Sequence, residues 1–61
     1  MKTITGELNK TNEKAVLYLL NSGKFGGKVN NDLYFISKNE CFYTVKILTG
    51  KTIIYATFTL N

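Results

Sequence analysis

The sequence contains no histidine, proline, tryptophan or arginine, and only one cysteine. Without histidine, neither a Ser-His-Asp triad nor a Cys-His pair can form, and one thiol with four carboxylates cannot build a zinc site. Local spacing implies no catalytic partner for any of the carboxylates, which are Glu7, Glu13, Asp32 and Glu40. A chain of 61 residues is also too small to enclose by itself the kind of pocket that tunes catalytic pKa values. We therefore expect no enzymatic activity, no cofactor and no metal.

The single cysteine excludes an internal disulfide. Cys41 begins the apolar run Cys41-Phe42-Tyr43, which predicts a buried thiol, because reactive thiols need an exposed, cationic setting. Residues 1–7 lack the apolar segment of a signal peptide. The longest apolar run, Ala15 to Leu20, is too short to cross a bilayer. These features favour a cytoplasmic protein in a reducing compartment.

The net charge is +4, and every positive charge is a lysine. Arginine is the usual reader of guanine edges, whereas lysine suits non-specific attraction to phosphates. Sequence-specific recognition of bases is therefore disfavoured, and non-specific nucleic-acid binding remains an alternative. A composition rich in Lys, Asn, Ile, Tyr and Phe is also what an AT-rich coding sequence produces, as in many bacteriophages. The basic charge is therefore weak evidence for nucleic-acid binding.

The length and composition predict a single domain over residues 1–61, of ordinary globular character. Alternating side chains predict a strand over Thr3 to Leu8. Apolar residues at helical spacing predict a helix from about Asn12 to Ser22. Thr11 or Asn12 would cap its start, and Gly23 would end it in the left-handed conformation.

The stretch Lys24 to Asp32 is the most loop-like part of the chain, although Lys28-Val29 could add a short strand. Strands are predicted over Leu33–Ser37, Cys41–Leu48 and, from Lys51 or Thr52, to Leu60. The expected fold is therefore α+β in the order β-α-β-β-β. It comprises a small antiparallel sheet of three to four strands, with one helix packed on one face.

Two predicted turns agree on which residues share the core face of this sheet. A turn at Thr49-Gly50 would pair Val45 with Ile54, and a turn at Lys38-Asn39 would pair Ile36 with Cys41. Both registers collect apolar side chains on one face, which favours this assignment. The predicted core-face residues are Tyr34, Ile36, Tyr43, Val45, Ile54, Ala56 and Phe58.

The second face of the sheet carries more apolar and aromatic groups than a solvated face should. Its predicted members are Leu33, Phe35, Phe42, Thr44, Lys46, Leu48, Ile53, Tyr55 and Thr57. One helix can cover only one side, so this face is either open or covered by the Gly-rich segment and Phe25. Open apolar patches usually mark interaction sites.

The Gly-rich segment Gly23–Lys28 lacks the spacing of a phosphate-binding loop, so we expect a flexible connection or a basic finger that contacts a partner. The last strand carries neither proline nor an inward charge to protect its edge. It should pair with the N-terminal strand, extend a partner's sheet or form a dimer. The candidate partner-binding residues are Phe35, Phe42, Lys46, Ile53, Tyr55, Lys24, Phe25 and Lys28.

These inferences predict a small non-enzymatic protein-binding module, with a dimer as the preferred oligomer. Its size and composition suit a bacteriophage-type inhibitor of a host factor, a nuclease or another host-defence protein. One alternative is a non-specific nucleic-acid binder that uses lysines and the aromatic sheet face. A second alternative is a structural subunit that assembles into a homo-oligomer.

Overall fold

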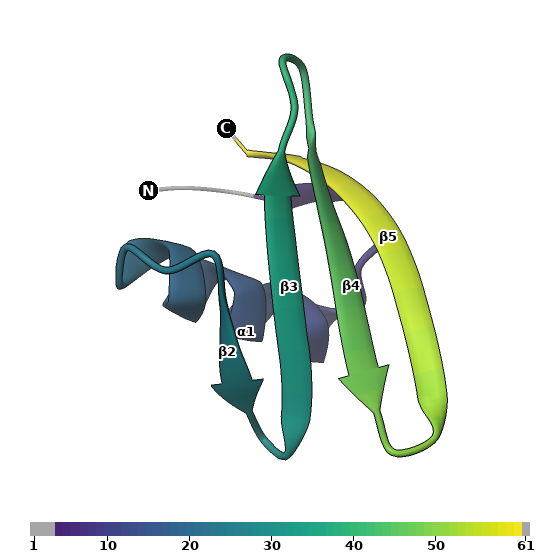
Figure 1. Ribbon diagram of the computed structural model, residues 1–61. Coiled ribbons are helices and arrows are strands. Elements are labelled where there is room, and N and C mark those ends of the chain that lie inside the picture. The colour runs from purple at the N-terminus through teal and green to yellow at the C-terminus, as the bar shows by residue number, and fades with distance from the viewer. Residues whose placement is uncertain (1–3, 61) are drawn as a thin grey trace.

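The computed structural model describes residues 4–60 and contains one helix and one five-stranded antiparallel sheet (Figure 1). The elements are β1 (Ile4–Gly6), α1 (Lys10–Asn21), β2 (Gly26–Val29), β3 (Asp32–Lys38), β4 (Tyr43–Thr49) and β5 (Thr52–Leu60). Their order across the sheet is β1-β5-β4-β3-β2. The predicted α+β class is confirmed. The predicted strand number and the order β-α-β-β-β are wrong, because the chain runs β-α-β-β-β-β.

The additional strand is β2, which lies in the stretch predicted to be the most loop-like and contains Lys28-Val29, the two residues given there as a possible short strand. Its two glycines have low strand propensity, but β2 pairs with β3 through a tight turn at Asn30 and Asn31. Both asparagines have positive φ, 52° and 70°, as two-residue hairpin turns often require. A Cβ at Gly27 would lie 3.1 Å from Leu19 Cδ2, so glycine here lets β2 approach the helix closely.

The helix begins earlier than predicted because Asn9, rather than Thr11 or Asn12, is the N-cap. The Asn9 side chain accepts a hydrogen bond of 2.8 Å from the Asn12 amide. At the other end, Gly23 has a φ of +75°, which confirms its predicted left-handed conformation. The amides of Gly23 and Lys24 bond to the carbonyls of Leu20 and Leu19, a Schellman ending.

The core lies between α1 and one face of the sheet, and Figure 1 shows the helix crossing that side. Ala15, Val16 and Leu19 of the helix belong to one buried cluster with sheet residues Ile4, Tyr34, Ile36, Val45, Ile47, Ala56 and Phe58. The Tyr34 hydroxyl donates a 3.0 Å hydrogen bond to Asn12 Oδ1, which joins β3 to the helix. Burial, with a smaller effect from the Asp32 charge, raises the pKa of Tyr34.

Both predicted hairpin registers are wrong, but the residues within the strands lie on the sheet faces predicted for them. Val45 pairs with Ala56, two positions from Ile54, because the turn lies at Gly50-Lys51. Ile36 pairs with Val45, four positions from Cys41, because a longer loop joins β3 to β4. Even displacements leave each side chain that lies within a strand on its predicted face of the sheet.

The buried members of the predicted core face are Tyr34, Ile36, Val45, Ala56 and Phe58. Tyr43 is half-buried and packs against the cluster. Ile54 is 36% exposed, so its predicted burial is wrong. It lies near the β4–β5 turn, at a register position opposite Ile47.

Two residues predicted to begin the strand Cys41–Leu48 lie instead in the β3–β4 loop. Cys41 and Phe42 lie between the strands, and the Asn39 amide closes this loop by donating to the Phe42 carbonyl at 2.7 Å. Cys41 is exposed, which contradicts the buried thiol expected from its apolar neighbours. Phe42 is exposed as well and belongs to neither sheet face.

The final strand pairs with the N-terminal strand, one of the three outcomes expected for it. β1 pairs with the end of β5, from Ile4 opposite Leu60 to Gly6 opposite Phe58. The predicted N-terminal strand is longer, and its first residue, Thr3, lies outside the described residues. Beyond Gly6, the Glu7 amide still donates to the Thr57 carbonyl, at 3.3 Å.

Candidate functional site

The sheet face opposite the helix exposes large apolar side chains from neighbouring strands. The exposed fractions are 41% for Leu33, 49% for Phe35, 51% for Ile53 and 72% for Tyr55. Successive side chains of a strand point to opposite faces, so these four lie away from the buried cluster. We define the open face as Leu33, Phe35, Lys46, Leu48, Ile53 and Tyr55, together with the hydroxyl residues Ser37, Thr44 and Thr57.

The strand registers arrange the open face in three rows of different polarity. The apolar row, nearest the Gly50 turn, contains Leu33, Leu48 and Ile53, with Lys28 of β2 at its margin. The central row contains Phe35, Lys46 and Tyr55, with Gly26 of β2 at its margin. The polar row contains Ser37, Thr44 and Thr57. The face therefore changes from apolar, through aromatic and cationic, to hydroxyl-bearing along the strands.

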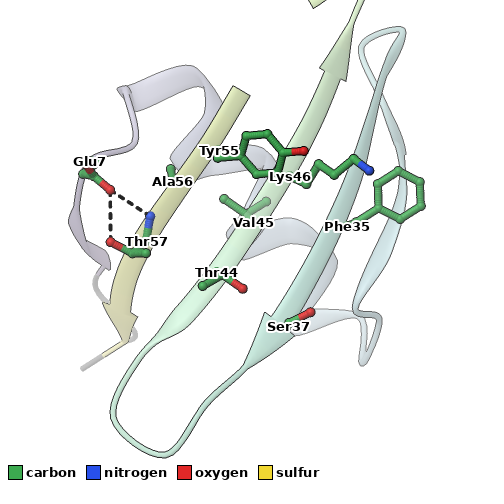
Figure 2. A pocket seen from close by; sticks show the side chains of 9 residues that line it. All are labelled: Glu7, Phe35, Ser37, Thr44, Val45, Lys46, Tyr55, Ala56 and Thr57. Atoms are coloured by element: carbon green, nitrogen blue, oxygen red, sulfur yellow. Dashed lines mark hydrogen bonds between the residues drawn. The ribbon is translucent and has the colours of Figure 1, made fainter. Parts of the chain in front are cut away.

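Lys46 lies at the centre of this arrangement, between the two aromatic residues of its row. Its Nζ is 5.7 Å from the centroid of the Phe35 ring. Figure 2 shows the lysine side chain extending toward Phe35, with Tyr55 on its other side. A cation over an aromatic ring at this distance contributes about 0.5–1 kcal/mol at an exposed site. This contact favours the conformation of Lys46 in which the ammonium group lies beside the Phe35 ring.

A shallow hollow of about 450 Å³ lies between the central and polar rows (Figure 2). Its lining includes Phe35, Ser37, Thr44, Lys46, Tyr55, Thr57 and Glu7. Glu7 lies at one side of the hollow, beside β5, and Lys46 extends toward β3 on the other. Rings, hydroxyls and two opposite charges can recognise a partner surface by contact and hydrogen bonding.

Glu7 is held in place by Thr57, which donates to Glu7 Oε1 from both its amide and its hydroxyl, each at 3.0 Å. The backbone hydrogen bond and, to a smaller extent, the hydroxyl hydrogen bond favour the charged carboxylate and lower the pKa of Glu7. A carboxylate whose pKa is lowered by folding stabilises the protein above its unfolded pKa. That contribution is lost as the pH falls through the lowered, folded value.

Replacing Glu7 with glutamine is expected to reduce the loss of unfolding free energy that the protein shows as the pH falls into the acid range. The urea midpoint of the wild type should exceed that of Glu7→Gln by a constant amount at neutral pH. The difference should shrink as the pH falls below the ordinary value of 4.5. Its size should be small, because the carboxylate is exposed to solvent. Urea titrations of both proteins across this range measure it. A difference that stays constant into strong acid would contradict the role given to Thr57.

The structure brings together some of the predicted partner-binding residues and separates others. Phe35, Lys46, Ile53 and Tyr55 share the open face, and Lys28 lies at its margin opposite Leu33.

Three other predicted partner-binding residues lie elsewhere. Lys24 follows the helix, where its amide completes the Schellman ending. The Phe25 carbonyl accepts a hydrogen bond from the Ile36 amide. This places Phe25 opposite Ile36, at a register position on the helix side of the sheet. Phe42 lines a separate hollow of about 410 Å³ at the β3–β4 loop.

Leu33 and Glu7 belong to the site although neither is a predicted partner-binding residue. Leu33 is predicted on the second face, and its exposure adds it to the site. Glu7 reaches the hollow through Thr57, fifty positions later in the chain, so local spacing carries no sign of the contact. The Gly-rich segment does not cover the open face, because Gly26 and the residues after it form the edge strand β2.

Comparisons with protein families, curated proteins and solved structures each found no match for this chain. In the part of the chain that the structure describes, His, Cys, Asp and Glu form no group of three or more suited to a metal ion. Within residues 4–60, the helix is not one that could span a membrane.

Proposed function

We propose that this protein is a non-enzymatic protein-binding module whose binding surface is the open face. The observation that carries the proposal is the exposure of Leu33, Phe35, Ile53 and Tyr55 on one continuous surface. Burying apolar area releases about 25 cal/mol per Å², so a partner that covers these side chains gains binding energy. Aromatic residues in the centre of an interface are the usual sources of that energy.

The distribution of charge favours a protein partner over a nucleic acid. Lys46 is the only cation in the central row, and Lys28 lies at the margin of the apolar row. Stacking platforms for single strands usually surround their aromatic rings with more positive charge. Glu7, beside the hollow, adds a carboxylate that would repel phosphates. Protein interfaces, in contrast, are depleted of charge in their centre and enriched in Tyr and Phe.

The identity of the partner is proposed from composition alone. A short, lysine- and asparagine-rich chain suits an accessory protein of a bacteriophage. In that setting, the open face would bind and inhibit a host factor or nuclease in the cytoplasm.

The test compares capture of partner proteins by immobilised wild type and two variants. The double substitution Phe35→Ser with Tyr55→Ser removes both rings of the central row. Tyr18→Ser removes an equally prominent ring, 62% exposed, from the helix. Hot-spot aromatics contribute about 2 kcal/mol each, so the double variant should bind at least about a hundredfold more weakly. Tyr18→Ser should bind like the wild type.

Far-UV circular dichroism of each variant provides the folding control. Both variants should give the spectrum of the wild type, because all three replaced side chains are exposed. Equal capture by the wild type and the double variant would refute the open face as the binding surface. Anisotropy of a labelled oligonucleotide addresses the alternative. Binding that weakens steeply with salt and requires Lys46 would replace the protein-binding proposal with the nucleic-acid one.

A further inference from the structure

One edge of the sheet is only partly covered, and this edge is the outer side of β5. β1 pairs with residues 58–60, and Glu7 binds Thr57 just beyond the end of β1. Within the described residues, no strand pairs with Thr52–Ala56 on the side away from β4. We call this segment the free edge. Such an edge is a template for another strand.

The hydrogen bonds of Thr57 show which backbone groups of the free edge point outward. Its amide donates to the Glu7 side chain and its carbonyl accepts from the Glu7 amide, so both face away from β4. Backbone groups alternate along a strand in an antiparallel sheet. The amides and carbonyls of Tyr55 and Ile53 therefore also face outward, whereas those of Ile54 and Ala56 face β4.

We propose that the free edge pairs antiparallel with the free edge of a second copy of this chain, around a two-fold axis at Ile54. In this register, Ile53 of each copy exchanges both backbone hydrogen bonds with Tyr55 of the other. A register centred on Tyr55 would set Ile53 against Thr57, which is already bonded to Glu7. A register centred on Ile53 would set Tyr55 against Lys51, which lies in the turn outside β5. In the register centred on Ile54, the sheets of the two copies become continuous.

The side chains of the free edge complement one another in this register. The two Ile54 side chains meet at the two-fold axis, where non-hydrogen-bonded neighbours approach most closely. This contact would cover an isoleucine that is 36% exposed although it lies on the helix side of the sheet. On the other side, Ile53 lies beside Tyr55, so the two open faces merge across the axis.

Charges at the two ends of the free edge favour a second copy as the occupant. Lys51 immediately precedes the free edge, and Glu7 lies immediately beyond its other end. Antiparallel pairing brings Lys51 of each copy next to Glu7 of the other, whereas the free edge itself carries no charged side chain. An unrelated strand would have to provide both the apolar residues and the matching charges.

The expected dimer is weak and depends on concentration. Pairing of one short edge buries less than the ~1,200–2,000 Å² of a standard stable interface. Dissociation constants in the micromolar to millimolar range are therefore expected. This inference does not depend on the partner proposed above, because the free edge and its register are defined by β5, Thr57 and Glu7 alone.

Sedimentation equilibrium of the full chain over a wide concentration range tests the pairing. The wild type should follow a monomer–dimer equilibrium. Ile54→Lys places two ammonium groups against each other at the axis and should weaken the dimer at least about tenfold. Tyr18→Lys adds the same charge on the helix and should leave the equilibrium unchanged. Circular dichroism checks that Ile54→Lys folds, as the partial exposure of Ile54 allows.

Cysteine cross-linking tests the register independently, in a Cys41→Ser background that removes the exposed native thiol. Non-hydrogen-bonded neighbours have Cα atoms about 4.5 Å apart, within the range of a disulfide. Ile54→Cys should therefore oxidise rapidly to a covalent dimer, and Tyr55→Cys slowly.

Three outcomes would overturn the proposal. They are a wild type that stays monomeric at every concentration, a dimer that Ile54→Lys leaves intact, and faster cross-linking through Tyr55→Cys. A monomer that still captures a partner protein through Phe35 and Tyr55 would leave the proposed function standing. A dimer that captures none would leave only the pairing.

Discussion

Replacing Phe58 with alanine is expected to remove much or all of the free energy of unfolding of this protein. Phe58 is 2% exposed and belongs to the core cluster. Its ring stacks on Tyr43, with a centroid distance of 5.1 Å and an interplanar angle of 6°. Truncating a buried phenylalanine costs about 3–5 kcal/mol. A domain of this length has a total stability of only roughly 3–9 kcal/mol, so the loss removes much or all of it.

Urea unfolding followed by circular dichroism measures this effect, with Phe25→Ala as the matched control. Phe25 is 56% exposed, so the same substitution there should change the free energy of unfolding by less than about 0.5 kcal/mol. If Phe58→Ala costs no more than Phe25→Ala, the position of the core between α1 and the sheet is wrong.

Replacing Gly6 with alanine is expected to detach β1 from the sheet. A Cβ at this position would lie 2.5 Å from the Thr57 carbonyl oxygen and 2.7 Å from Phe58 Cα. Both are backbone atoms of β5, so no side-chain rotation can relieve the clash. If β1 moves away, Ile4 leaves the core and the hydrogen bonds to β5 are lost. The combined cost should be about 2–4 kcal/mol.

The control for this prediction is another glycine with a different constraint. Gly50 has a φ of +60°, and a Cβ added to it would meet no atom within 4 Å. Gly50→Ala should therefore lower the free energy of unfolding only by the energy of placing alanine in the left-handed conformation, about 1–2 kcal/mol. Hydrogen exchange of the Glu7 amide, which bonds to the Thr57 carbonyl, reports the detachment directly. The exchange should accelerate in Gly6→Ala and not in Gly50→Ala. Protection of this amide in Gly6→Ala would show that β1 remains paired.

The open face and the free edge meet at Ile53 and Tyr55, which contribute side chains to the first and backbone groups to the second. If both proposals hold, pairing of two copies presents one merged apolar surface to a partner. A partner that binds across both copies would then have a higher overall affinity, because the second contact adds to the first without the first becoming stronger.

Alternation of side chains along the strands is sufficient to assign the two faces of the sheet. It places Tyr34, Val45 and Phe58 on the buried face and Phe35 and Tyr55 on the exposed one, as the fold confirms. These assignments survive two wrong registers, because displacements of two and four positions do not change the face. The helix can also be predicted from the sequence, since the helical spacing of its apolar residues and the terminating Gly23 are local signals.

The tertiary structure decides what depends on contacts between distant parts of the chain. β2 forms because β3 pairs with it, against the propensity of its glycines, and Cys41 is exposed because the β3–β4 loop is longer than predicted. Glu7 joins the site only because β1 lies beside the end of β5. Alternation is a property of one strand, so sequence alone determined which side each residue faces. Turn positions, edge coverage and the Glu7–Thr57 contact depend on how strands compete for partners, and that competition is resolved only in the folded chain.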